Sequence, residues 1–364
     1  MSSKFLLPVV LAGLLAGCGA SASHHATHDF IITAAKPGHL FVLDPRKAKV
    51  VSDFTIPDAH NYANTIVPSP DGDVAYVLVD KATSIAGIDL RTGKQVFRAN
   101  LSSPGERVQS MAFDVTPDGK ELIVYELPTQ FDIDAYKVEP PQFAIFSSAG
   151  GLYALPLRTF PAPRRVQAVL ASKDGRSFYA VWPEVYHFDL KTGRLLDERG
   201  LLDWGRPNHS TSDVSINSPA SGPTGIYALP LYSTLTGAGL PADGVHATSL
   251  MTLDLHTGEL AYHDISRTAP NIFSTSISPD RHYAFGVFSA LFKIDLRHWS
   301  IVEQVPVAHS YYMVNVSSDG RELYLGGNMC DVAIYDASTL HEKADIKLPG
   351  CGDQALVPLR VIER

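Results

Sequence analysis

The chain has 364 residues, of which 45% are hydrophobic and 19% are charged, and its formal net charge is −8 at pH 7. That composition is globular, and the length suits one large domain or two smaller ones. The sequence lacks the basic stripe typical of nucleic-acid-binding proteins, so we predict no nucleic-acid partner.

Residues 1–17 have the pattern of an export signal. Lys4 provides a positive start, and the apolar run Phe5–Leu15 is too short to span a bilayer. The run ends in Leu-Ala-Gly-Cys, which matches a bacterial lipobox, so we predict cleavage before Cys18 and a lipid on that cysteine. The alternative is an ordinary cleaved signal with an incidental cysteine. Residues 18–28 would then be a tether, and the predicted location is the periplasm, with a lipid anchor in a membrane.

From residue 29 onward, short apolar runs alternate with turn residues and show no helical period. In Ser318-Asp319-Gly320, for example, glycine tolerates a positive φ and the aspartate can bond the backbone two residues on. Similar turns recur about every forty residues, as expected for a repeat architecture. Runs expected to be strands include Val74–Val79, Leu122–Tyr125, Leu152–Leu157, Phe178–Val181, Ile226–Leu231, Tyr283–Val287 and Glu322–Leu325. In the unit that contains Ile226–Leu231, the segment Asn217–Gly222 takes the place of the turn.

Six such units are complete, and a seventh near the N-terminus lacks its first strand. The C-terminal run Ala355–Ile362 is a lone strand with no partner after it. We therefore predict an all-β fold over residues 29–364: a seven-bladed β-propeller of four-stranded antiparallel blades. The C-terminal strand joins the N-terminal blade and closes the ring, which leaves no open sheet edge.

Two further cysteines, Cys330 and Cys351, lie in the last unit, before its third strand and after its fourth. Antiparallel neighbours bring those two strand ends together, and export places the chain where disulfides persist. We predict a Cys330–Cys351 disulfide, with two free thiols as the alternative.

Signals for catalysis are weak. The sequence has no nucleophile elbow, phosphate-binding loop, zinc-protease motif or haem-attachment motif. The aspartates of the turns recur once per unit, which favours a structural role over calcium binding. We therefore predict no catalytic residue, no bound cofactor and no metal site in this chain.

Residues that do not recur from one unit to the next give more information about function than the turn residues do. In a propeller, the links between blades and between the two middle strands of a blade share one face. Here those links are aromatic and polar, and two long insertions, Glu126–Pro141 and Tyr232–Ala247, share that face. Aromatic residues with His and Arg suit a protein interface, although such residues can equally pack the loops. The interface candidates are Trp204, His209, Asn271, Phe273, His309, Tyr311 and Tyr312.

The segments His309–Gly320, Leu325–Gly327, Asp331–Leu340 and Leu348–Gly350 resemble the β subunit of quinohemoprotein amine dehydrogenase. The His-Ser-Tyr-Tyr block is the specific part, and weaker likeness extends over most of residues 29–362. The lipobox and the cysteine pair depart from the family pattern.

The resemblance implies a seven-bladed propeller within a periplasmic αβγ complex that oxidises primary amines. The small γ subunit carries a cysteine tryptophylquinone and the catalytic base, and the α subunit carries two c-type haems. The propeller itself holds no cofactor, so the interface candidates are expected to contact the γ subunit and line the amine pocket. The alternatives are a stand-alone membrane-tethered propeller that binds a protein or glycan, and a propeller hydrolase whose central metal would need residues such as Asn64, Asp213 and Asn315.

Overall fold

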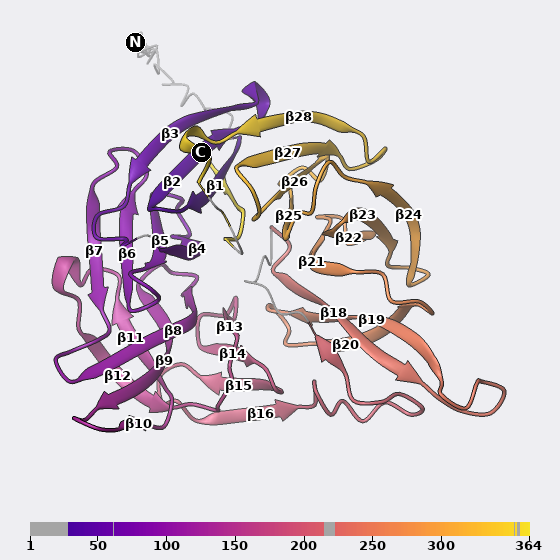
Figure 1. Cartoon of the computed structure of the whole chain (residues 1–364), viewed down its shortest axis with the longest axis horizontal. Coiled ribbons are helices and arrows are strands. Elements are labelled where there is room, and N and C mark those ends of the chain that lie inside the picture. Colours follow the sequence, from indigo (N-terminus) through magenta and orange to yellow (C-terminus); the bar gives the residue numbers. More distant parts are fainter. Residues whose placement is uncertain (1–27, 61, 215–222, 353, 355–356) are drawn as a thin grey trace, which may run out of the picture.

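The computed structural model describes residues 28–60, 62–214, 223–352, 354 and 357–364. The predicted signal, lipobox cysteine and most of the tether lie outside the described residues, as does the segment Asn217–Gly222 that was expected to lead into the strand Ile226–Leu231. Seven sheets, each built on four antiparallel strands, are arranged around a central axis (Figure 1). This confirms the predicted seven-bladed β-propeller.

Blades are numbered here in ring order. Blade 1 contains β29 (Arg360–Glu363), β1 (Asp29–Ala35), β2 (His39–Asp44) and β3 (Lys49–Thr55), with the short helix η1 (Pro45–Lys47). Blade 2 contains β4 (Ala63–Pro68), β5 (Val74–Val79), β6 (Ser84–Asp89) and β7 (Gln95–Asn100). Blade 3 contains β8 (Glu106–Val115), β9 (Glu121–Phe131), β10 (Tyr136–Val138), β11 (Gln142–Ser147) and β12 (Pro156–Pro161).

Blade 4 contains β13 (Ala168–Ala171), β14 (Ser177–Val181), β15 (Val185–Asp189) and β16 (Leu195–Arg199). Blade 5 contains β17 (Asp213–Val214), β18 (Ile226–Leu235), β19 (Val245–Asp254) and β20 (Leu260–Ser266). Blade 6 contains β21 (Ile272–Ile277), β22 (Tyr283–Phe288), β23 (Ala290–Asp295) and β24 (Ser300–Pro306). Blade 7 contains β25 (Met313–Val316), β26 (Glu322–Gly326), β27 (Asp331–Asp336) and β28 (Glu342–Lys347), followed by η3 (Pro349–Cys351).

The ring closes as predicted. Strand β29 pairs antiparallel with β1, with Arg360 opposite Ile32 and Ile362 opposite Phe30. The junction continues beyond the strand, because the backbone groups of His28 and Arg364 bond each other at 2.9 and 3.1 Å. Both termini of the propeller are thus held in one sheet, which removes the unpaired edges that favour aggregation.

The repeated aspartates build the turns between the first two strands of a blade. The Oδ1 atom of Asp71 accepts bonds from the Ser69 hydroxyl at 2.5 Å and the Asp73 amide at 3.0 Å. Asp319 does the same in blade 7, and Gly320 follows it with a φ of 74°, which a side chain would strain. These contacts agree with the structural role predicted for the turn aspartates.

Two predicted strands differ from the structure. The run Leu152–Leu157 begins instead as the short helix η2 (Gly151–Tyr153), and its strand, β12, starts only at Pro156. The predicted C-terminal strand Ala355–Ile362 is shorter, since β29 begins at Arg360. Apolar composition marked both runs, but side-chain pattern alone does not say where backbone pairing starts.

The core lies between neighbouring blades. Apolar side chains on facing sheets interlock, as where Phe143 of blade 3 meets Phe178 of blade 4 edge-to-face with ring centroids 4.9 Å apart. Blade 1 packs on blade 2 through a further cluster that includes Ile32 and Val77. Each buried side chain of this size contributes roughly 1.5–3 kcal/mol relative to exposure, so the stacking of blades stabilises the ring.

Candidate partner-binding face

The two ends of the blades differ in their connections. Turns joining the first to the second strand, and the third to the fourth, lie at one end, which we call the turn face. Links between blades and between the two middle strands lie at the other end, the loop face. All seven interface residues predicted from the sequence belong to or border loop-face segments.

Three aromatic rings from blades 6 and 7 form a stack on the loop face. The centroid of Phe273 lies 4.2 Å from that of Phe288 and 5.1 Å from that of Tyr312, with interplanar angles of 21° and 16°. All three side chains are half-buried. We call this group the aromatic stack. Asn271, which precedes β21, is exposed. The sequence therefore identified two of the three rings and missed Phe288.

Tyr311 occupies a different place from its neighbour. It is 1% exposed and belongs to the core cluster between blades 6 and 7, and its amide bonds the carbonyl of Phe288 at 2.9 Å. Its side chain therefore supports the loop from beneath instead of presenting a surface.

His309 is held by acceptors on both sides of its ring. Its Nε2 lies 3.0 Å from both carboxylate oxygens of Asp331, and its Nδ1 lies 3.0 Å from the carbonyl of Ser310. Burial lowers the pKa of His309, but the hydrogen bond to Asp331 and the bond to Ser310 outweigh it, so the pKa is raised. Two acceptors favour the imidazolium, in which both nitrogens donate. Lys347 bonds the same Asp331 at 3.1 Å and also Asp345 at 2.5 Å, so two carboxylates balance the charges of Lys347 and the protonated His309.

Trp204 and His209 lie together over blade 5. The indole Nε1 donates to the carbonyl of Ser210 at 2.9 Å, and the guanidinium of Arg206 lies 5.0 Å from the indole centroid. The His209 ring meets Trp204 edge-to-face at 5.3 Å. Its side chain is only 4% exposed, and burial lowers its pKa despite the nearby carboxylate of Asp264. These two residues therefore anchor the loop.

Both long insertions prove to be extensions of the middle strands into hairpins. In blade 5, β18 and β19 continue to Leu235 and Val245. The preceding loop pairs with the end of β18 through an isolated bridge at His209, where the amide of Ser210 bonds the carbonyl of Thr234 and the amide of Thr236 bonds that of Asn208, both at 2.8 Å. Leu235 is consequently buried. We call this the blade 5 hairpin.

The blade 3 hairpin, β9 with β10, exposes apolar side chains instead. Ile133 is 102% exposed, Tyr136 78% and Val138 65%. Phe131 and Tyr136 meet edge-to-face at 5.2 Å, which fixes the tip's shape. Exposed, contiguous apolar side chains of this kind mark interaction sites. The insertion was visible in the sequence with Phe131 and Tyr136, whereas Ile133 and Val138 carried no distinguishing signal.

At the base of the blade 3 hairpin lies a buried carboxyl group. Glu126 is 5% exposed, and its Oε2 accepts from the Gln142 amide at 2.7 Å. Burial raises its pKa to about 7, against the opposing effect of Gln142. The group therefore titrates near neutral pH, where ordinary glutamates are ionised.

Other predicted sites are addressed only in part. Cys330 is disulfide-bonded, while the side chain of Cys351 lies outside the described part of the chain, so their pairing stays a prediction. Among described residues, no three His, Cys, Asp or Glu side chains gather closely enough to hold a metal ion. Asn315, considered for a central metal, instead donates to the carbonyl of Leu359 at 3.1 Å. None of the helices in the described ranges is long and apolar enough to cross a membrane.

Comparison with known proteins supports the fold. No protein-family profile matches the chain, and no curated protein sequence matches it. Among solved structures, a functionally unknown protein from Desulfotomaculum acetoxidans has a TM-score of 0.60 at 11% identity, covering 92% of this chain and 99% of that one. Hydrazine synthase from Kuenenia stuttgartiensis has a TM-score of 0.53 at 14% identity, covering 87% and 95%. Dihydro-heme d1 dehydrogenase NirN has a TM-score of 0.52 at 15% identity, covering 88% and 73%. At these identities the likeness extends to the propeller fold.

Proposed function

We propose that this chain is the β subunit of an exported quinohemoprotein amine dehydrogenase. In this role it holds a small quinone-bearing γ subunit and helps to enclose the pocket where a primary amine is oxidised to an aldehyde and ammonia. It contributes no catalytic residue and no cofactor of its own, since the tryptophylquinone and the c-type haems belong to the γ and α subunits.

The observation that carries the proposal is the exposed apolar tip of the blade 3 hairpin. Ile133, Tyr136 and Val138 leave large apolar surfaces in water, which favours burial against a partner protein. The aromatic stack offers a second, flatter surface on the same face. Both fit a subunit interface, where aromatic residues are enriched.

Two further observations support an oxidoreductase complex. The block beginning at His309 resembles the amine dehydrogenase β subunit. In addition, two proteins that share the fold are named as a synthase of hydrazine and a dehydrogenase of a haem. A propeller of this kind in the periplasm, tethered through a lipid on Cys18, would keep the complex near membrane electron carriers.

The test is a pull-down of the full-length chain from its native membranes in mild detergent, with haem staining and mass spectrometry. The proposal expects a dihaem cytochrome c and a small internally cross-linked polypeptide in the eluate. Recovery of the propeller alone, or with an unrelated protein, would overturn it in favour of a stand-alone binding module.

A further inference from the structure

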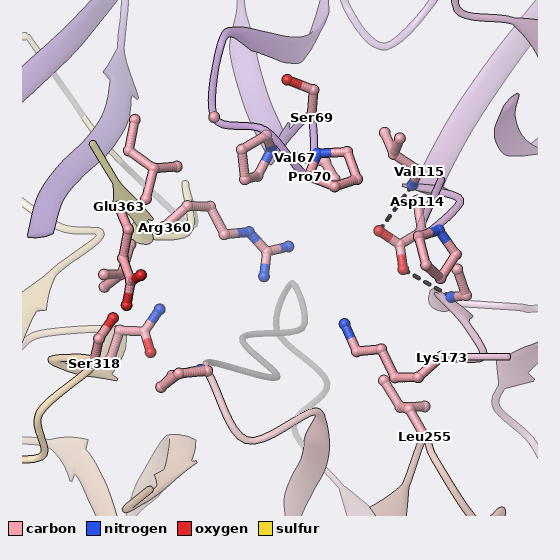
Figure 2. Close-up of a pocket in the computed structure, with 18 residues that line it drawn as sticks. Val67, Ser69, Pro70, Asp114, Val115, Lys173, Leu255, Ser318, Arg360 and Glu363 are labelled. Atoms are coloured by element: carbon pink, nitrogen blue, oxygen red, sulfur yellow. Dashed lines mark hydrogen bonds between the residues drawn. The ribbon is translucent and has the colours of Figure 1, made fainter. Parts of the chain in front are cut away.

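A cavity of about 590 Å³ lies on the axis of the ring and opens at the turn face. Its wall is built from the inner strands and their turns, and includes Val67, Asp114, Val115, Lys173, Ser318 and Arg360. Figure 2 shows Arg360 and Lys173 reaching into the same space from opposite sides, with Asp114 on the side of Lys173, across from Arg360. A cavity of this size suits a small molecule.

Arg360 presents its guanidinium to the cavity in a fixed orientation. The side chain comes from β29, and its Nε donates to the carbonyl of Ile66 on β4 at 2.8 Å. Within the described part of the chain, its two terminal nitrogens have no hydrogen-bond partner and no ion pair. Burial lowers the pKa of Arg360 to about 10, which the charge of Asp114 only partly opposes. The group remains protonated at neutral pH and, among the residues that the structure describes, lacks a close counter-ion.

Asp114 does not serve as that counter-ion. Its Oδ1 accepts from the Val115 amide at 2.9 Å and its Oδ2 from the Ala171 amide at 2.8 Å. These bonds tie the carboxylate to the wall and link blades 3 and 4. Burial raises the pKa of Asp114 against these bonds. One carboxylate faces two cations, Arg360 and Lys173, so this part of the cavity keeps a net positive charge.

Lys173 supplies the second cation. It is an exposed residue of the Lys173-Asp174-Gly175 turn, and its ammonium forms no ion pair among the described residues. The exposed Glu363 lies at the cavity's edge in Figure 2, away from the space between the cations. Apolar wall residues such as Val67, Val115 and Leu255 complete the cavity.

We propose that this cavity binds a small organic anion, a carboxylate or a phosphate ester, between Arg360 and Lys173. The planar guanidinium can donate two parallel bonds to either group, and the lysine adds a point charge from the other side. The apolar wall would cover the ligand's carbon skeleton. This site lies on the face opposite the blade 3 hairpin and does not depend on the proposed function.

The experiment is calorimetric titration of the full-length chain in detergent with succinate, glycerol phosphate and inorganic phosphate. We expect saturable one-to-one binding of at least one organic anion. Tighter binding of succinate than glycerol phosphate identifies a carboxylate site, and the reverse identifies a phosphate-ester site. Binding of inorganic phosphate alone would contradict the proposal, because the apolar wall would then have no role.

Charge reversals provide the matched control. Lys173→Glu and Lys191→Glu both change exposed turn lysines of blade 4, but only Lys173 lines the cavity. Lys173→Glu should weaken binding about tenfold, since it replaces an attraction by a repulsion, whereas Lys191→Glu should leave it unchanged. Arg360→Gln should weaken it about tenfold or more by removing charged hydrogen bonds. Absence of saturable binding, or equal affinities in wild type and Lys173→Glu, would overturn the proposal.

Discussion

The blade 3 and blade 5 hairpins occupy the same topological position but treat their apolar residues in opposite ways. The blade 5 hairpin is covered by its own preceding loop, anchored by Trp204, and buries Leu235. The blade 3 hairpin is widened by β8 and β10, yet leaves Ile133 and Tyr136 in solvent. An insertion whose apolar side chains are buried within the chain contributes to its stability. An insertion whose apolar side chains stay in solvent has a surface that a partner protein can bury.

The largest effect should come from the anchor of the blade 5 hairpin. Trp204→Ala removes a buried ring with contacts to His209, Tyr262 and Arg206, so stability should fall by about 3–5 kcal/mol. Ile133→Ser in the other hairpin should change stability by less than about 0.5 kcal/mol. Urea unfolding monitored by circular dichroism measures both. Similar losses in the two variants would erase the distinction between the hairpins.

Glu126 tests the base of the blade 3 hairpin. Because its pKa is raised from 4.5 to about 7, the folded protein holds a proton that the unfolded chain releases, and stability falls as pH rises through this range. Glu126→Gln should therefore stabilise the protein by about 2–3 kcal/mol at pH 8 and have little effect at pH 4.5. Unfolding midpoints across this range give the answer. The control Glu198→Gln changes an exposed glutamate of β16, and a matching pH-dependent gain there would refute the assignment.

A substitution in the aromatic stack should affect assembly with a partner more than it affects the stability of the propeller. Tyr312→Ala removes one half-buried ring and should cost about 1 kcal/mol of stability. If the ring contacts the γ subunit, the same change should lower the yield of the complex or raise the apparent KM for amine. Unchanged assembly and kinetics would remove the stack from the interface and leave the blade 3 hairpin as its remaining candidate.

The smallest effect concerns His309. Its raised pKa means that the Asp331 interaction stabilises the fold fully below pH 6.5 and is lost as pH rises through the folded pKa. His309→Gln should cost about 1 kcal/mol at pH 5.5 and less at pH 9. Thermal unfolding at the two pH values measures this difference, and a pH-independent cost would show that the imidazolium is not involved.

The sequence predicted the ring because its turns are local. Asp319 bonds atoms two residues away, and Gly320 follows with a positive φ. The conformation of each turn is therefore determined by a few consecutive residues. Closure by the last strand followed from counting strands. Turns of this kind can therefore be predicted from one sequence, without knowledge of the fold.

The cavity and the division of the interface residues could not be predicted in this way. Arg360 comes near Asp114 and Lys173 only because β29 crosses from the C-terminus into the centre of the ring. Tyr311 and Tyr312 are adjacent and identical in the sequence, yet one is in the core and the other in the stack. Both residues precede β25, and the path of this link against blade 6, where the Tyr311 amide bonds the Phe288 carbonyl, sets that difference.

The most direct test of the central claim is the native-membrane pull-down performed on three chains in parallel: wild type, Ile133→Asp/Tyr136→Asp, and Ala242→Asp. The first variant places charges on the exposed blade 3 tip, and the second places one at an exposed position of the blade 5 hairpin. Our account predicts that haem and the small cross-linked polypeptide accompany the wild type and Ala242→Asp but are lost from the blade 3 variant. Equal recovery from all three chains, or from none, would contradict it.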